Sequence, residues 1–112
     1  MVLLGFTVLR EKLLDGTKTQ TIRLPRKRPF KVGNKLQVYW KLRTKQCEKL
    51  FDAIVTKVET KAIGDIDEED AKLDGFDTVL DFRIAFFDLH PDIAMSDWPY
   101  STEVDIITFV RQ

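Results

Sequence analysis

The chain has little of several residue types, and each shortage excludes a class of protein. Of its 112 residues, one is cysteine, Cys47, and one is histidine, His90. A single cysteine cannot form an internal disulfide, so we exclude a disulfide-stabilised secreted fold and expect a reducing, cytoplasmic environment. One cysteine and one distant histidine supply no metal-ligand set, so we expect no metal site. We expect no cofactor. We interpret His90 as a cation at the end of a helix.

Long apolar runs are also missing. The apolar start from Met1 to Phe6 is interrupted by Gly5, and no later stretch approaches the roughly 20 apolar residues of a membrane-spanning helix. We therefore expect no membrane segment, no export signal and no membrane partner. The composition, with 44% hydrophobic residues, is sufficient for a packed core, and we expect one domain over residues 1–112.

Charge is abundant, but its two signs are separated along the chain. Residues 1–61 hold 15 Lys or Arg against 5 Asp or Glu, whereas residues 62–112 hold 3 against 13. The densest basic stretch runs from Arg23 to Lys31, and it predicts a face that contacts an anion such as phosphate. The acidic half is a second candidate surface, for a basic protein partner.

Hydrophobic periodicity and capping residues predict the order of the elements. We expect a helix over Thr7–Asp15, strands over 19–24 and 36–42, one long or bent strand within 47–63, a short helix over 66–75, a third helix from near Asp77 to before Pro91, a loop over 90–102 and a strand over 104–110. The third helix carries two apolar stripes and is expected to fill a core. Together these elements predict an α+β fold built on a small, partly closed barrel of about five or six strands, with about three helices.

A polar octapeptide, Gly16 to Arg23, is the strongest candidate site. It places Lys18, three threonine hydroxyls and Arg23 directly after a glycine helix stop. The alternative interpretation is an exposed strand edge guarded by charges. Asp74, before Gly75, is either a solvated residue or part of the site. The expected ligand-binding residues are Lys18, Thr19, Thr21, Arg23, Arg26, Lys27, Arg28, Lys31 and Lys41.

Two aromatic residues, Tyr39 and Trp40, occupy opposite faces of one predicted strand. At most one of them can stack on a base while the other packs inside. We favour Trp40 as the core residue.

Three blocks in this order resemble the ASCH domain, the activating signal cointegrator homology family. The blocks are Gly16 to Arg23, Phe30 to Leu36, and Glu69-Asp70-Ala71 followed by Asp74-Gly75-Phe76. The chain is similar to the small stand-alone ASCH proteins of archaea and bacteria. The resemblance implies a PUA-like mixed or antiparallel β-barrel that binds RNA or a modified nucleoside in a cleft between the barrel and a helix.

The same resemblance leaves open whether the chain is an enzyme. Some small bacterial members are amidohydrolases that remove the acetyl group of N4-acetylcytidine with a Lys, a Thr and a Glu, and these roles fall on Lys18, Thr21 and Asp74. A base role for Lys18 requires its pKa to fall from about 10.4 to roughly 7 or 8, which requires burial. Aspartate in place of glutamate shortens the reach by about one methylene. We expect Lys18→Ala to abolish any hydrolysis while barely changing fold stability.

Overall fold

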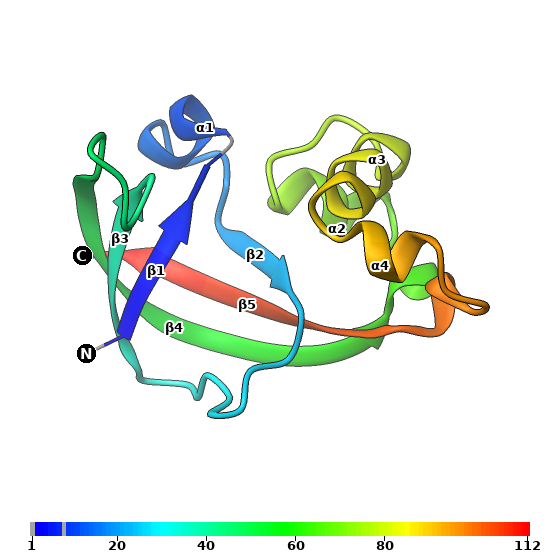
Figure 1. The fold of residues 1–112 in the computed structure, drawn as a ribbon. Helices are drawn as coiled ribbons and strands as arrows, with labels where there is room; N and C mark the ends of the chain where they lie inside the picture. Colours follow the sequence, from blue (N-terminus) through cyan, green and yellow to red (C-terminus); the bar gives the residue numbers. More distant parts are fainter. Residues whose placement is uncertain (1, 8) are drawn as a thin grey trace.

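The computed structural model describes residues 2–7 and 9–112, and its centre is one mixed sheet that curls into a half-barrel (Figure 1). The strands are β1 (Val2–Phe6), β2 (Gln20–Arg23), β3 (Lys35–Trp40), β4 (Glu48–Ala62) and β5 (Glu103–Arg111). They lie in the order β1-β3-β4-β5-β2, so β1 and β2 are the two edges of the sheet. The α+β class and the five-stranded, partly closed barrel that the sequence predicts are confirmed.

Pairing in the sheet is antiparallel except between the edge strand β1 and β3, which run parallel. The longest strand, β4, pairs first with β3 and then with β5, and its register shifts between Val55 and Lys57. Such a bulge bends a strand and increases its twist, which lets β4 serve both sides of the curled sheet. The long or bent strand predicted within 47–63 is therefore confirmed, as is its hairpin with the preceding strand.

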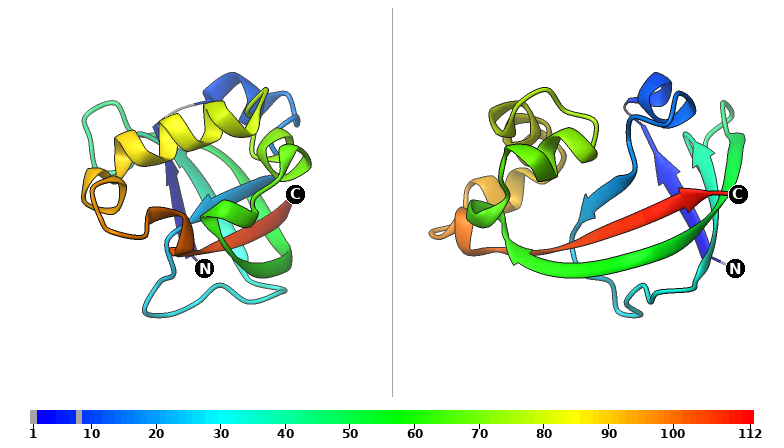
Figure 2. Two further views of the ribbon diagram at one scale, coloured as in Figure 1. Left: turned by 90° about the vertical axis from the view of Figure 1, so that its right-hand side faces the viewer. Right: turned by 180° about the vertical axis from the view of Figure 1, so that it is seen from behind.

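The helices are α1 (Arg10–Leu14), α2 (Glu68–Leu73), α3 (Val79–Leu89) and α4 (Pro91–Ala94), with short 3-10 turns η1 (Ile63–Asp65) and η2 (Pro99–Ser101). Figure 2 shows α2, α3 and α4 gathered at the end of β4 and β5 that lies away from the C-terminus. Within the part of the chain that the structure describes, no helix is long and apolar enough to cross a membrane. The fourth helix and η2 lie within 90–102, where the sequence predicts a loop.

Capping explains why α2 and α3 begin where they do. The Asp67 carboxylate accepts from the Asp70 amide at 2.8 Å in a capping box, and the Thr78 hydroxyl accepts from the Asp81 amide at 3.1 Å. Gly75 ends the α2 segment with φ +96°. The predicted cap at Asp67 and stop at Gly75 are confirmed.

The N-terminal prediction is partly wrong. Residues Val2–Phe6 form a strand whose backbone pairs with β3 and whose Leu4 and Phe6 side chains enter the barrel core, and the helix expected from Thr7 begins only at Arg10. Leu9 precedes it in left-handed backbone, φ 63°, without a side-chain cap, so Thr7 is not the cap. The part of that prediction that falls on Val8 lies outside the described residues. The stop at Gly16, φ +83°, is confirmed.

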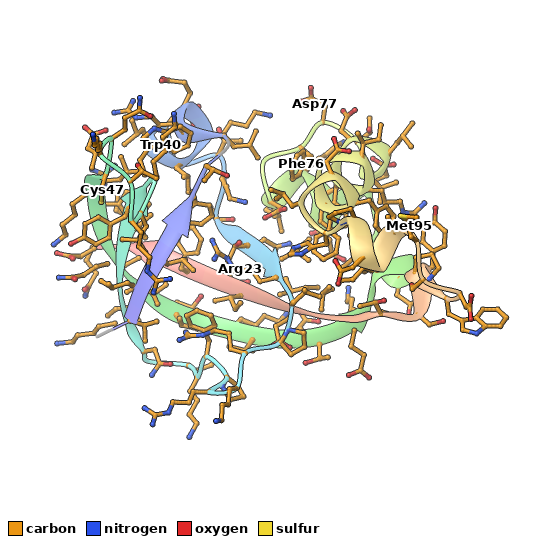
Figure 3. The ribbon with its side chains drawn as sticks, in the orientation of Figure 1. Arg23, Trp40, Cys47, Phe76, Asp77 and Met95 are labelled. Atoms are coloured by element: carbon orange, nitrogen blue, oxygen red, sulfur yellow. The ribbon has the colours of Figure 1, made fainter. Side chains whose placement is uncertain are left out.

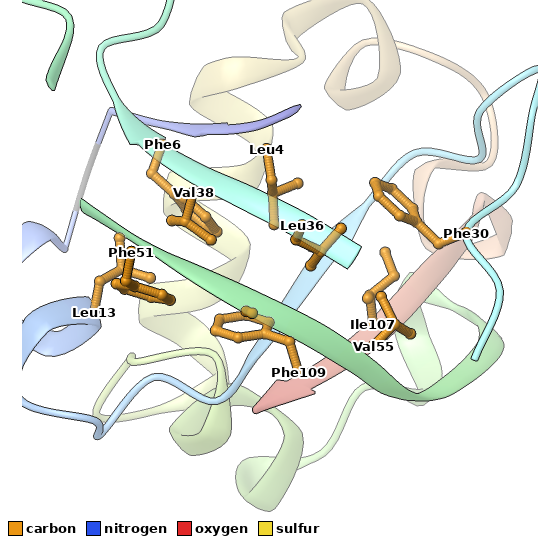
Figure 4. Close-up of a cluster of buried hydrophobic side chains, with 11 residues drawn as sticks. Leu4, Phe6, Leu13, Phe30, Leu36, Val38, Phe51, Val55, Ile107 and Phe109 are labelled. Carbon is orange, nitrogen blue, oxygen red and sulfur yellow. The ribbon is translucent and has the colours of Figure 1, made fainter. Parts of the chain in front are cut away.

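Two hydrophobic cores hold these elements together. One fills the barrel and is drawn in Figure 4; its members include Leu4, Phe6, Leu36, Val38, Phe51, Val55 and Phe109. Trp40, expected as a core residue, is only partly buried and packs against this core. The other lies under α3 and includes Ile22, Ile63, Phe82, Phe86, Val104 and Ile106.

The apolar residues predicted on α3 are buried to very different extents. Phe82 is 2% exposed, whereas Leu80 is 62% exposed and Ile84 54%. A helix at the edge of a small fold packs one face against the sheet. The expectation that this helix fills a core is confirmed through Phe82 and Phe86, whereas Leu80 and Ile84 point to solvent.

Candidate functional site

The start of β2 is docked along the end of α2, and this junction assembles the site. The Thr19 amide donates to the Leu73 carbonyl at 3.0 Å, and the Gln20 side-chain amide donates to the Asp70 carbonyl at 2.9 Å. Gln20 is 4% exposed, so its bond is shielded from water. These bonds fix the octapeptide relative to the acidic helix.

Lys18 and Asp74 meet at this junction as a buried pair. The Lys18 ammonium donates to the Asp74 carboxylate and, at 2.7 Å, to the Asp74 backbone carbonyl. Both residues are 4% exposed. At Gly75 a Cβ would lie 3.1 Å from a Leu9 methyl and 3.5 Å from the Lys18 Cβ, so glycine permits the close packing of the two segments.

Arg23 connects the two edge strands beside this pair. Its Nη2 donates to the Gly5 carbonyl of β1 at 2.6 Å, and its Nε donates to the Thr21 hydroxyl at 3.1 Å. Its guanidinium carbon lies 4.8 Å from the centre of the Phe6 ring. Figure 3 shows Arg23 in the middle of the molecule, between β1 and β2. Because the Thr21 oxygen accepts from Arg23, its own hydrogen is available to a ligand.

These side chains line a cavity of about 440 Å³ between the edge strands and α3. The polar lining comes from Lys18, Thr21, Arg23, Arg26 and Asp74, and the aromatic lining from Phe6, Phe76, Phe82, Phe86 and His90. The volume lies in the range of small-molecule sites. A lining of aromatic side chains together with polar groups suits a flat heterocycle that carries hydrogen-bonding edges.

Burial shifts the pKa of the paired groups towards each other. It raises the pKa of Asp74 to about 6, although the Lys18 ammonium, the Ile22 amide and Arg23 all lower it. It lowers the pKa of Lys18 in spite of the Asp74 carboxylate, and Arg23 lowers it further. Burial therefore favours the neutral amine of Lys18 and the neutral acid of Asp74 more than water does. Shifts of both pKa values towards neutrality suit groups that exchange protons in general acid–base chemistry.

Asp74→Asn is expected to remove a pH dependence of stability. The folded pKa of Asp74, about 6, lies above its ordinary 3.8. The protonated acid therefore stabilises the fold below about pH 4, and this stabilisation is lost as pH rises to about 6, by about 3 kcal/mol in all. Urea unfolding of both proteins between these pH values tests it: the wild type should lose stability relative to Asp74→Asn. Parallel pH profiles would contradict the shift.

The structure separates the remaining predicted binding residues into three groups. Arg26 lines the cavity, with its guanidinium carbon 4.5 Å from the Phe30 ring. Lys27, Arg28 and Lys31 are exposed on the loop between β2 and β3, outside the cavity lining. Lys41 and Thr19 lie elsewhere: the Lys41 ammonium donates to the Gln46 side chain at 2.8 Å, and Thr19 lines a smaller cavity of about 230 Å³.

Sequence reasoning missed the aromatic wall. Phe82, Phe86 and His90 follow helical spacing on the buried side of α3, and the His90 ring lies 4.6 Å from the Phe86 ring. That spacing in the sequence indicates that the three residues share one face of the helix. It does not indicate that this face borders a cavity. His90 does lie at the helix end, as predicted. Among the described residues, no group of three or more His, Cys, Asp or Glu side chains is placed to hold a metal ion, and Cys47 is exposed (Figure 3).

Two solved structures have a similar fold. A crystal structure of an ASCH domain from Lactobacillus crispatus superposes with a TM-score of 0.74 at 12% identity, over 98% of this chain and 79% of that one. A protein from Enterococcus faecalis of the DUF984 family gives 0.73 at 18% identity, over 98% and 78%. No family model matches the sequence, and no curated protein matches it.

Proposed function

This chain has an ASCH-like fold, and we propose that it binds RNA or a nucleotide. In this proposal the basic loop contacts phosphates and the cavity receives one nucleobase or modified nucleoside. The observation that carries the proposal is the cavity itself, whose lining combines aromatic side chains with polar and cationic ones. The location expected from the family resemblance, between barrel and helix, is where this cavity lies.

The loop between β2 and β3 supplies a suitable phosphate surface. Arg26, Lys27, Arg28 and Lys31 are exposed along it, and Arg26 joins it to the cavity. Contacts of this kind position a nucleic acid without reading its sequence. A base taken from the same strand would reach the cavity beside Arg26, where the Thr21 hydroxyl and the Lys18–Asp74 pair offer hydrogen bonds to base edges.

Salt-dependent RNA titration tests this function. About five or six phosphate contacts predict a log–log salt slope near about −4 on single strands, and Lys27→Gln with Lys31→Gln should flatten it by about 1.4. Lys57→Gln with Lys72→Gln is the matched control, because these two exposed lysines lie outside the loop. The control should keep the wild-type slope. Equal slopes in all three proteins would contradict the assignment of the loop.

A second candidate function, hydrolysis of N4-acetylcytidine or a related acylated nucleoside, is supported by the Lys18–Asp74 pair. Lys18 is buried, as a base role requires, and the pKa of Asp74 is raised to about 6. Thr21 lies in the same cavity with Arg23 on its oxygen. Lys18 in its neutral form would accept a proton from Thr21 or from water, and the oxygen would attack the acetyl carbonyl. The bond from the acetyl carbon to N4 would then break as the protonated Lys18 or Asp74 protonates the leaving amine, which frees acetate directly when water attacks. When Thr21 attacks, the acetyl ester formed on its oxygen would be hydrolysed in a second step by a water that gives its proton to Lys18.

Incubation with N4-acetylcytidine tests this candidate. The hydrolase hypothesis predicts that the wild type releases cytidine and acetate. Thr21→Val should release them at least about a hundredfold more slowly. Thr19→Val is the control, since that hydroxyl lies outside the cavity lining. Wild-type protein that releases no cytidine would reject the hydrolase and leave the binding function as the proposal.

A further inference from the structure

The cavity carries more positive than negative charge. Among its lining residues, all of which the structure describes, Asp74 is the one acidic side chain, against Lys18, Arg23 and Arg26. Lys18 and Asp74 are paired with each other. The two arginines therefore remain as a net positive charge within the cavity.

Arg23 has no carboxylate partner of its own. Its hydrogen bonds go to a carbonyl and a hydroxyl, both uncharged, and no ion pair within 4.0 Å involves it in the described part of the chain. The pKa of Arg23 is lowered to about 10, chiefly by burial; Asp74 opposes this shift, and the nearby Arg26 contributes to it. A shielded cation without a counter-ion is unfavourable, and an anionic group of a ligand would compensate it.

Arg26 stands at the solvent side of the same cavity. It is exposed, its guanidinium is held over the Phe30 ring, and the residues described here provide no acidic partner for it. The guanidinium groups of Arg23 and Arg26 keep N–H groups that donate to no other described residue. Two neighbouring guanidinium groups fit the oxygens of a phosphate better than the edge of a base.

We infer that the cavity binds a nucleotide with a terminal phosphate, held between Arg23 and Arg26, with the base on the aromatic wall. This inference rests on the proposed nucleotide-binding function and narrows its ligand. A phosphomonoester carries about −1.5 to −2 charges near neutral pH, close to the sum of the two arginines, whereas a phosphodiester inside a strand carries −1. A free nucleoside monophosphate and the phosphorylated end of an RNA share this chemistry.

Calorimetric titration of the four nucleosides and their 5′- and 3′-monophosphates tests the inference. At least one monophosphate should bind about tenfold or more tightly than its nucleoside. Arg26→Gln should reduce that preference to about threefold or less. Lys57→Gln, an exposed lysine outside both the loop and the cavity lining, should leave it unchanged. Arg26 is exposed, so its replacement leaves the packed core intact. A second comparison uses one short RNA with a terminal phosphate and the same RNA with terminal hydroxyls.

The outcomes separate this inference from the proposed function. Equal affinity for nucleoside and monophosphate would overturn the inference while nucleoside binding stands. The inference would also be overturned if the protein binds no free nucleotide and binds the RNA equally well with and without its terminal phosphate. A preference for the phosphorylated RNA end over free monophosphates would support it and identify RNA as the source, and the reverse order would identify free nucleotides. A protein that binds none of these ligands would contradict the proposed function as well.

Discussion

Lys18→Met is expected to lower the free energy of unfolding by about 3 to 5 kcal/mol near neutral pH. The substitution keeps an unbranched apolar chain but removes the ammonium that faces the Asp74 carboxylate, and both residues are 4% exposed. The carboxylate would then be buried without its partner, and it also loses the charge that lowers its pKa. Burial of Lys18 thus replaces the sequence-based expectation that its removal barely changes stability.

The double variant Lys18→Met with Asp74→Leu separates loss of the pair from loss of packing. Replacing both members of a buried ion pair by apolar side chains is often neutral, so most of the lost stability should return. Urea unfolding measures both variants. The raised pKa of Asp74 gives a further signature: the deficit of Lys18→Met should grow as pH rises above about 6 and shrink below it. A deficit under about 1 kcal/mol near neutral pH would contradict the buried pair.

Phe82→Ala is expected to cost about 3 to 5 kcal/mol of unfolding free energy. Phe82 is 2% exposed, and its ring lies 5.9 Å from that of Phe76 and 5.6 Å from that of Phe86, so it anchors α3 on the second core. Truncation removes apolar contacts and leaves a cavity between helix and sheet.

Leu80→Ala is the matched control for that result, because Leu80 lies on the same helix and is 62% exposed. It should change stability by no more than about 0.5 kcal/mol. Chemical denaturation with equal m-values would compare the two variants. Similar losses of unfolding free energy in both variants would contradict the packing of α3 through the Phe82 face.

Local signals explain which parts of the fold could be predicted. Alternation in Leu36 to Trp40 and along β4 gave the central strands, and Asp67 and Gly75 set the limits of the α2 segment. The edge strand β1 was not predicted, because a short apolar run interrupted by Gly5 does not distinguish a strand from a helix start, and its partner β3 is more than 30 positions away in the chain. On α3, two apolar stripes look equal in the sequence. Only packing decides that Phe82 is buried and Ile84 exposed.

The candidate site was also predictable only in part, because local sequence signals do not show which distant residues meet. Lys18 and Asp74 were singled out together through the family resemblance, since nothing local connects residues separated by 56 positions. Their burial depends on how β2 docks against α2. The aromatic wall depends on the placement of α3, and the position of Lys41 beside Gln46 depends on the turn after β3, so neither could be read from the pattern.

The most direct measurement is a heteronuclear NMR titration of the labelled protein with a short single-stranded RNA and with nucleoside monophosphates. Binding through the proposed site predicts that the largest amide shifts lie at Lys18 to Arg26, Asp74 and His90, with RNA adding shifts through Lys31. In control spectra of Arg26→Gln, the amide shifts of the cavity residues should appear only at higher ligand concentration. Shifts confined to the exposed face of α3 around Leu80 and Ile84, or no shifts with any of these ligands, would contradict the proposed function.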